Sequence, residues 1–222
     1  MIKFVVDSKE IEVKEGTTIL KACLDNQIYI PNLCYMETLA TPPASCRLCF
    51  VEIEGRDRPI TSCNTNALNG MVVKTDTPSV RQLQRTAFEL LMSIHDVDCA
   101  HCPANKKCAL QQIARFLKIG LKPRRLPHTL KEPDIYEDHP FLDYHLNRCV
   151  LCGKCIHVCR TQHSQPLMAF AKRGFSTLIS FFGKESLADL PCETCLACVG
   201  ICPVSAITLK DNQDQTAKDL PV

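Results

Sequence analysis

The first 15 residues alternate between apolar and polar positions, which predicts two β-strands. The apolar positions of this alternation are Ile2, Phe4, Val6, Ile11 and Val13. A period of two residues is typical of half-buried strands. Asp7-Ser8-Lys9 lies between the two series and reads as a turn. We therefore expect an N-terminal β-hairpin.

A short helix is predicted after the hairpin. Thr17 or Thr18 can cap it, and Ile19, Leu20 and Cys23 then share one side. Cys23 lies one helical turn from Ile19, so we expect it to be a small buried apolar residue and not a ligand. The chain from 28 to 63 is rich in loops and proline, with an alternating strand at 50–53, and a closing strand follows at 71–73. Together these elements predict a small α+β unit.

The middle of the chain has a helical period. Thr77-Pro78 is a strong helix start. The apolar series that follows is Val80, Leu83, Ala87, Leu90, Leu91 and Ile94. This helix would deliver His95 at its C-terminal end, and a second helix is predicted at 109–117. Residues 121–140 are rich in Pro, Arg and Lys and predict an irregular, solvent-exposed connector, with a docking surface as the alternative.

Residues 141–209 contain an approximate internal repeat. Each half carries a Cys-x-x-Cys-x-x-Cys-x-x-x-Cys run, and the segment between them, 167–182, is predicted to be a strand or a hairpin. Residues 211–222 are polar and predict a frayed tail.

Composition narrows the class of protein. The 222 residues include only 6% aromatic residues and no Trp. A small core of this kind would need additional stabilisation, for example from bound metal clusters. The net charge of +2, from 26 basic and 24 acidic residues, gives no reason to expect nucleic acid or an anionic membrane as a partner. We find no signal peptide and no apolar run long enough to span a bilayer. A cytoplasmic, reducing compartment is expected, where dense cysteine indicates metal binding and not disulfides.

Fifteen of the 16 cysteines fall into four groups with ligand-like spacing. The N-terminal group consists of Cys34, Cys46, Cys49 and Cys63. A close pair with two more distant cysteines, in a β-rich setting, predicts a 2Fe–2S cluster of the plant type, although the first spacing is longer than the plant pattern. A zinc site is the alternative.

The two C-terminal groups have the spacing of a two-cluster bacterial ferredoxin. In such proteins three cysteines of one run hold one cluster and the fourth ligates the other cluster. The pattern therefore predicts two crossed 4Fe–4S sites. The first comprises Cys149, Cys152, Cys155 and Cys202, and the second comprises Cys159, Cys192, Cys195 and Cys198. Zinc explains a doubled four-cysteine run poorly.

The middle group offers only three cysteines: Cys99, Cys102 and Cys108. A 4Fe–4S cluster needs a fourth ligand, and His95 is the natural candidate through a neutral imidazole nitrogen. His101 is the rival, but it lies inside the Cys99–Cys102 turn, where its side chain would tend to point away. By charge alone, imidazole in place of thiolate should raise the potential of this cluster.

These four groups, in this order, resemble the N-terminal region of the large iron–sulfur subunit of respiratory complex I. The same region is fused to iron-only hydrogenases and some formate dehydrogenases, and it occurs as the small diaphorase subunit of NAD-linked nickel–iron hydrogenases. Three features carry the resemblance: Ser45-Cys46-Arg47-Leu48-Cys49 followed by Val51-Glu52-Ile53, His95-x3-Cys99-x2-Cys102-x5-Cys108-Ala109-Leu110-Gln111, and the ferredoxin-like 149–202. It covers residues 1 to about 210.

The resemblance implies an α+β protein with three cluster-bearing domains. They are a 2Fe–2S ferredoxin-like β-grasp domain at 1–77, a small helical domain with a one-histidine, three-cysteine 4Fe–4S cluster at 78–135, and a two-cluster 4Fe–4S ferredoxin-like domain at 136–210, with a flexible tail at 211–222. It also supports His95 as the fourth ligand of the middle cluster.

The implied function is electron transfer within a multi-subunit oxidoreductase. One 2Fe–2S and three 4Fe–4S clusters would relay electrons between an NAD(P)H-linked flavoprotein subunit and a separate catalytic subunit, such as a hydrogenase, a formate dehydrogenase or another reductase. The complex would be cytoplasmic or lie on the cytoplasmic face of a membrane. The chain has no G-x-G-x-x-G after a strand and no P-loop, and it ends soon after Cys202, so we expect no nucleotide or catalytic site of its own.

Two other classes of protein fit parts of the pattern. One is a free, diffusible polyferredoxin, and the other is a zinc-stapled structural protein. An isolated carrier rarely needs four clusters, and acidic charge would favour docking to basic reductases, whereas this chain is near neutral. The sequence therefore favours a subunit of a larger enzyme.

Overall fold

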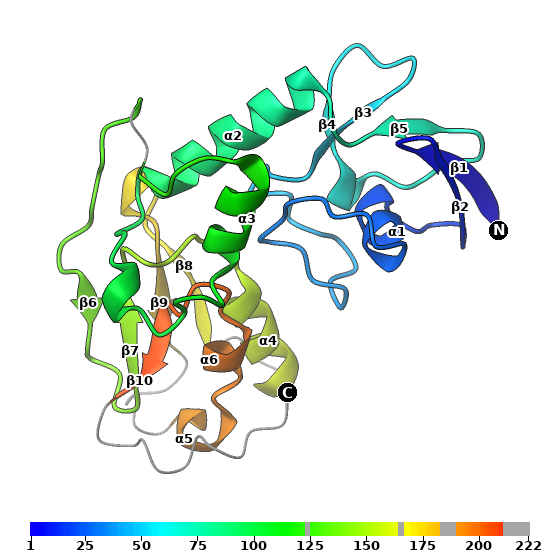
Figure 1. Ribbon diagram of the computed structural model, residues 1–222. Helices are drawn as coiled ribbons and strands as arrows, with labels where there is room; N and C mark the ends of the chain where they lie inside the picture. Colours follow the sequence, from blue (N-terminus) through cyan, green and yellow to red (C-terminus); the bar gives the residue numbers. More distant parts are fainter. Residues whose placement is uncertain (123–124, 164–166, 183–189, 211–222) are drawn as a thin grey trace. The chain divides into compact units, whose positions relative to one another are not determined.

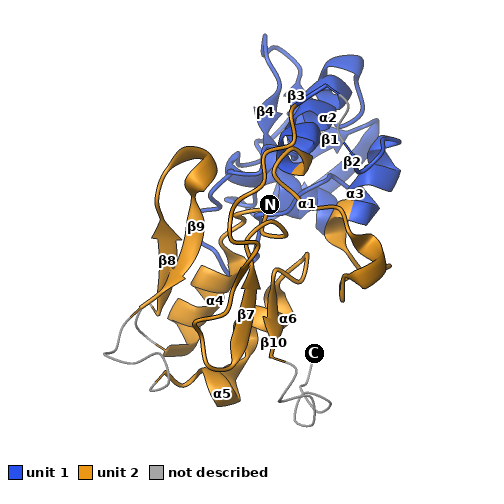
Figure 2. Cartoon of the chain, turned by 90° about the vertical axis from the view of Figure 1, so that its left-hand side faces the viewer, with its two compact units in different colours: residues 1–91, 111–126 blue, residues 92–110, 127–222 orange. Residues whose placement is uncertain are grey.

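The computed structural model is a mixed helix and strand protein, and it describes residues 1–122, 125–163, 167–182 and 190–210 (Figure 1). The chain forms two compact units. Unit 1 comprises residues 1–91 and 111–126, and unit 2 comprises residues 92–110 and 127–222 (Figure 2). The division into three domains remains a prediction. The predicted frayed tail at 211–222 lies outside the described residues.

Unit 1 contains a five-stranded mixed sheet in the order β2-β1-β5-β3-β4. Its strands are β1 (Ile2–Val6), β2 (Lys9–Val13), β3 (Phe50–Ile53), β4 (Ile60–Thr61) and β5 (Val72–Lys74). β1 pairs antiparallel with β2 and parallel with β5, which in turn pairs antiparallel with β3. The strands predicted at 50–53 and 71–73 are confirmed, the second with a shift of one residue.

The predicted N-terminal hairpin is confirmed, and its turn explains its register. Asp7 and Ser8 have φ values of 47° and 72°, and Val6 lies opposite Lys9. Two central residues in the left-handed region make the kind of two-residue turn whose twist matches that of the strands. Phe4 then lies opposite Ile11, so that the apolar face of both strands enters the core.

The first helix, α1 (Ile19–Asp25), packs against this sheet. Its cap is Thr18, whose Oγ1 accepts a hydrogen bond from the Lys21 N–H at 3.3 Å. Ile19, Leu20 and Cys23 are fully buried in the core of unit 1. The prediction that Cys23 is a core residue is confirmed. A 3₁₀ turn, η1 (Ser62–Asn64), follows β4 and carries Cys63.

The predicted helix after Thr77-Pro78 is α2 (Pro78–Met92), and it is shorter than expected. It ends three residues before His95, which lies in the following loop. Val80 and Phe88 are buried, but Leu90 is 54% exposed, so its assignment to the apolar face was wrong. At about 100° per residue, Leu90 lies about 80° away from Val80 around the helix. The second predicted helix is confirmed as α3 (Ala109–Leu117).

Unit 2 is built around a three-stranded antiparallel sheet in the order β10-β7-β6. Its strands are β6 (Ile135–Tyr136), β7 (Leu142–His145) and β10 (Ile207–Leu209), beside a separate hairpin of β8 (Met168–Ala171) and β9 (Leu178–Phe181). The predicted hairpin at 167–182 is confirmed. β6 corrects the prediction of an irregular connector, because its two residues pair with β7.

Helices carry most of the C-terminal cysteines of unit 2. They are α4 (Lys154–His163), α5 (Cys192–Cys195) and α6 (Ala197–Ile201), with the 3₁₀ turns η2 (Cys99–His101) and η3 (Gly174–Ser176) elsewhere in the unit. α4 packs against α6, which brings together the two halves of the internal repeat. Among the described residues, no helix has both the length and the apolar character required to cross a bilayer.

Candidate metal centres

The N-terminal cysteine group lies buried beside the sheet of unit 1. Cys34, Cys46, Cys49 and Cys63 are each at most 6% exposed. The Sγ atoms of Cys34 and Cys46 lie 3.4 Å apart. Ser62 fixes the position of Cys49, because its N–H and its hydroxyl both donate to the Cys49 carbonyl oxygen, at 2.9 and 2.7 Å. The structure therefore brings these four thiols into one region.

Hydrogen bonds favour the thiolate form at two of these four positions. The hydrogen bond between the Cys34 and Cys46 side chains lowers the pKa of Cys34, with help from Ser45. The Cys63 thiol does the same for Cys49, whose pKa is also lowered. Thiolate is the form of cysteine that binds metals. Each hydrogen bond therefore favours the thiolate at one cysteine of a pair and raises the pKa of its partner, Cys46 or Cys63.

The loop that carries Cys46 and Cys49 depends on two left-handed residues. Ala44 has a φ of 50° and Arg47 a φ of 54°. Such values are uncommon for residues other than glycine and bend the chain tightly. The hydrogen bonds from this loop to Cys34 and Cys46 involve Ser45 and Leu48. Sequence reasoning did not find this loop geometry, because neither Ala nor Arg signals a left-handed conformation.

The middle group lies in unit 2, between the end of α2 and the start of α3. Cys99 begins η2, Cys102 follows it, and Cys108 immediately precedes α3. Cys108 is buried, whereas Cys99 and Cys102 are half-buried. The N–H of Asn105 donates to the Cys102 carbonyl oxygen at 3.0 Å and closes a tight turn between the second and third cysteines.

His95 and His101 differ sharply in their surroundings. His95 Nδ1 lies 3.0 Å from the Arg148 carbonyl oxygen, so Nδ1 carries the hydrogen and Nε2 keeps its lone pair free. Burial lowers the pKa of His95, which keeps the ring neutral at neutral pH. A ring held through one nitrogen is the usual arrangement of a metal-ligating histidine. His101 has an 81% exposed side chain, and its Nδ1 pairs with Asp98 at 2.8 Å.

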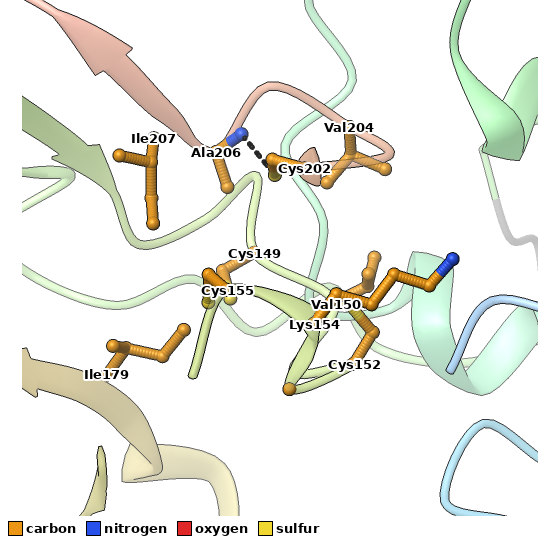
Figure 3. Close-up of a pocket in the computed structure, with 11 residues that line it drawn as sticks. Cys149, Val150, Cys152, Lys154, Cys155, Ile179, Cys202, Val204, Ala206 and Ile207 are labelled. Carbon is orange, nitrogen blue, oxygen red and sulfur yellow. Dashed lines mark hydrogen bonds between the residues drawn. The ribbon is translucent and has the colours of Figure 1, made fainter. Parts of the chain in front are cut away.

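The third group lines a pocket in unit 2 with one cysteine from far along the chain. Figure 3 shows Cys149, Cys152 and Cys155 together with Cys202, which comes from the segment before β10. The rest of the lining is mainly apolar and also includes one lysine: Val150, Gly153, Lys154, Ile179, Val204, Ala206 and Ile207. Cys202, distant from the other three in the sequence, therefore shares a pocket with them.

Backbone N–H groups point at the sulfur atoms of this pocket. The Leu151 N–H lies 3.4 Å from Cys149 Sγ. The Ala206 N–H lies 3.2 Å from Cys202 Sγ, as the dashed line in Figure 3 shows. Leu151 itself has a φ of 52°, which turns the loop around the sulfurs. Such N–H···S bonds favour negative charge on sulfur. Burial alone acts in the opposite sense and raises the pKa of Cys152 to about 11.

The fourth group is formed in the same crossed manner. Cys159 lies on α4, yet its electrostatic neighbour is Cys195 on α5. Burial, followed by the charges of Cys192, Cys159 and Cys195, raises the pKa of Cys198 to about 12. Leu196, with a φ of 47°, separates α5 from α6 and turns the chain between these cysteines. The fourth cysteine of the first run therefore lies among the first three of the second run.

The chemistry of these donor sets fits iron–sulfur clusters. The candidate donors are thiols and one imidazole, and N–H groups are directed at sulfur in the third group, as is typical of such clusters. Over the part of the chain that the structure describes, no three His, Cys, Asp or Glu side chains are arranged to hold a single metal ion. Protonated thiols must lose their protons when metal binds, so loading of the sites is coupled to proton release.

Two protein-family descriptions match the chain. Residues 1–78 match a 2Fe-2S iron-sulfur cluster binding domain, and residues 84–121 match the NADH-ubiquinone oxidoreductase-G iron-sulfur binding region. The first match covers the N-terminal cysteine group, and the second covers His95 and the middle cysteines. Domains that bind 2Fe–2S and 4Fe–4S clusters are therefore present.

Similar proteins extend the match to almost the whole chain. A G-type subunit of NADH-quinone oxidoreductase from Rhizobium meliloti (strain 1021) is 34% identical over 207 residues, which are 93% of this chain and 24% of the relative. The HndD subunit of the NADP-reducing hydrogenase of Solidesulfovibrio fructosivorans is 34% identical over 216 residues, or 93% of this chain and 36% of the relative. The chain thus spans about a quarter to a third of the length of these relatives.

A solved structure is also similar. A chain of NAD+-reducing [NiFe]-hydrogenase in the H2-reduced state superimposes with a TM-score of 0.82 and 28% identity, over 95% of this chain and 88% of that chain. The resemblance predicted from the cysteine groups is confirmed: the chain contains two iron–sulfur binding regions and is similar to the G-type subunits of NADH-quinone oxidoreductases and to NAD(P)-reducing hydrogenase subunits.

Proposed function

We propose that this chain is an electron-transfer subunit of a cytoplasmic, NAD(P)-linked, multi-subunit oxidoreductase. It would bind one 2Fe–2S cluster through the N-terminal cysteine group and three 4Fe–4S clusters through the other groups. The observation that carries the proposal is the crossed pocket, in which Cys202 joins Cys149, Cys152 and Cys155. Such crossing is the arrangement of a two-cluster ferredoxin.

The ligand assignments follow from the four groups of side chains. The 2Fe–2S ligands would be Cys34, Cys46, Cys49 and Cys63. The 4Fe–4S ligands would be His95, Cys99, Cys102 and Cys108 for one cluster, Cys149, Cys152, Cys155 and Cys202 for the second, and Cys159, Cys192, Cys195 and Cys198 for the third. His95 is preferred to His101 because its ring is buried and held at Nδ1, which leaves Nε2 free as a donor.

The protein would bind the clusters, bury them and stabilise the negative charge on their sulfur ligands. When bound, iron–sulfur clusters accept and release single electrons. The side chains would hold sulfur in place, the mainly apolar lining of the pocket around Cys149 and Cys202 would limit access of water, and N–H groups such as that of Ala206 would stabilise negative charge on sulfur. No acid, base or nucleophile is needed for such a relay.

The fold of unit 1 supports the assignment of its cluster. A mixed sheet in the order β2-β1-β5-β3-β4 with α1 packed on it is the pattern expected of a β-grasp ferredoxin domain. The cysteine loop lies between α1 and β3, and Cys63 follows β4. We retain three cluster-bearing segments as the proposed domains, at 1–77, 78–135 and 136–210.

The comparisons favour a subunit over a free carrier. The similar chain of NAD+-reducing [NiFe]-hydrogenase is matched over 88% of its length, so a chain of comparable extent is a component of that enzyme. The relatives named as subunits of NADH-quinone oxidoreductase and NADP-reducing hydrogenase point the same way. The partners would be a flavin- and NAD(P)-binding subunit and a separate catalytic subunit. A free-standing polyferredoxin is the alternative.

Anaerobic purification of the native protein tests the proposal. We expect about 14 iron atoms per chain, as one 2Fe–2S and three 4Fe–4S clusters require, and distinct 2Fe–2S and 4Fe–4S signals in low-temperature EPR of the reduced protein. We also expect a flavoprotein to co-purify and to reduce these signals when NADH or NADPH is added. A stable monomer that carries all its clusters would favour the polyferredoxin, and zinc without iron would overturn both.

A further inference from the structure

The loop that carries His95 follows the end of a helix and precedes the first cysteine of the middle group. α2 ends at Met92, and the His95 N–H donates to the Met92 carbonyl oxygen at 3.3 Å. The next element is η2, which begins at Cys99. Regular secondary structure therefore does not fix the direction of the His95 ring, and contacts with other segments have to do so.

The segment 127–131 holds this loop from one side. His128 Nε2 lies 2.9 Å from the His95 carbonyl oxygen, and because a carbonyl oxygen can only accept, the imidazole N–H of His128 is the donor. The Thr129 N–H donates to the Ser93 carbonyl oxygen at 2.8 Å. One side-chain and one backbone hydrogen bond therefore attach the segment to the main chain of the His95 loop.

Asn147 and Arg148 hold the same loop from a second side. The Asp96 N–H donates to the Asn147 carbonyl oxygen at 2.8 Å, and His95 Nδ1 donates to the Arg148 carbonyl oxygen at 3.0 Å. The two sides are joined to each other, because the Asn147 side chain exchanges two hydrogen bonds with the backbone of Lys131. Both the main chain and the ring of His95 are thus held within one closed network.

We propose that His128 is a positioning residue that fixes the His95 loop, so that the His95 ring keeps one orientation with Nε2 as the donor to the middle cluster. The inference rests on the proposed function, in which His95, Cys99, Cys102 and Cys108 bind one 4Fe–4S cluster. Outer partners that orient a ligating imidazole strengthen metal binding. A ring that is already held loses less conformational freedom when it binds.

The exposure of His128 makes its contribution separable from packing. Its side chain is exposed, so its removal leaves no cavity, and the hydrogen bond to His95 is what is lost. His128→Gln keeps a side-chain N–H donor, whereas His128→Ala removes it. His101→Ala is the matched control, because it removes another exposed histidine of the same unit, whose Nδ1 pairs with Asp98 at 2.8 Å.

The test is pulsed EPR of the reduced, cluster-loaded protein, which detects a coordinated imidazole through the hyperfine coupling of its nitrogen. The protein is titrated with 2-mercaptoethanol, whose thiolate bonds to the iron as the neutral imidazole leaves. We expect the concentration that removes half of the nitrogen coupling to be about fivefold lower in His128→Ala, as the loss of one hydrogen bond implies. His128→Gln and His101→Ala should match the native protein. An equal midpoint in His128→Ala and the native protein, or no loss of coupling in His128→Ala, would overturn the role of His128.

Amide hydrogen exchange tests the contacts themselves, even if His128→Ala does not take up clusters. In the native, cluster-loaded protein the Thr129 and Asp96 amides should exchange more slowly than in an unstructured chain, because both donate hydrogen bonds within the network. Exchange at the rate of an unstructured chain would overturn the proposal. A native protein without any nitrogen coupling would instead contradict the assignment of His95 within the proposed function, before any variant is compared.

Discussion

Asn147 and Lys131 form a reciprocal pair of hydrogen bonds across unit 2. The Lys131 N–H donates to Asn147 Oδ1 at 2.8 Å, and Asn147 Nδ2 donates to the Lys131 carbonyl oxygen at 3.0 Å. Nδ2 also donates to Asp134 Oδ1 at 2.8 Å, and the Asn147 carbonyl oxygen accepts from the Asp96 N–H at 2.8 Å. One buried residue thus connects the segment after His95, the 127–134 segment and the loop that begins at Cys149.

Replacement of Asn147 should therefore destabilise unit 2. Asn147→Ala removes three side-chain hydrogen bonds and leaves the backbone groups of Lys131 without their partner. At about 1 kcal/mol per lost hydrogen bond, we expect the free energy of unfolding to fall by about 2–3 kcal/mol. Urea denaturation of the cluster-loaded protein measures it. Asn69→Ala removes one exposed bond to the Lys3 N–H and should cost less, so equal losses would contradict the prediction.

His95 and His101 provide a direct test of the fourth ligand of the middle cluster. We expect His95→Ala to remove or alter one 4Fe–4S signal in low-temperature EPR, because the buried imidazole with a free Nε2 is lost. His101→Ala should leave all signals in place, since that ring is exposed and pairs with Asp98. If His101→Ala changes the signal and His95→Ala does not, the assignment is wrong.

Cys23 should differ from the predicted cluster ligands, because its replacement should not change the 2Fe–2S signal. It is completely buried in the core of unit 1, and burial raises the pKa of its thiol to about 12. Because the thiolate is the reactive form, we expect Cys23 to resist alkylation at about pH 8 until the protein unfolds. Cys23→Ala should preserve the 2Fe–2S signal, whereas Cys34→Ser should alter it. Mass spectrometry after alkylation and EPR measure the two effects, and loss of the signal in Cys23→Ala would make Cys23 a ligand.

His139 should make the stability of unit 2 depend on pH. Its Nδ1 accepts from the Phe141 N–H at 3.2 Å, and burial, followed by the charge of Lys210, lowers its pKa. The unfolded state then binds more protons, so the contribution of His139 is fully present above about pH 6.5 and is lost as the pH falls below that value.

The variant His139→Asn isolates this contribution, because Asn keeps an acceptor for the Phe141 N–H and does not titrate. We expect it to lose less stability than the native protein between about pH 7.5 and about pH 5.5, as measured by urea denaturation at both values. An identical pH dependence in the two proteins would show that His139 does not contribute.

The predictions that succeeded rest on short-range patterns. The N-terminal hairpin, α1 and α3 follow from periods and caps within a few residues, and these were confirmed. Predictions failed where contacts with residues distant in the sequence determine the local structure. α2 ends at Met92 and leaves Leu90 exposed, and β6 forms only because Ile135 and Tyr136 pair with β7. The family resemblance also rested on local spacing of cysteines, and it was confirmed.

The sequence by itself indicated which cysteines could act together, because their spacing follows known cluster-binding patterns, including the one in which the fourth cysteine of each run joins the other run. Only the tertiary structure decided what surrounds the sulfur atoms. The hydroxyl of Tyr144 reaches the Ile179 N–H across 35 residues, and Asn147 holds Lys131 across 16. Hydrogen bonds between segments so far apart depend on how strands and loops pack, and no local period or spacing records them.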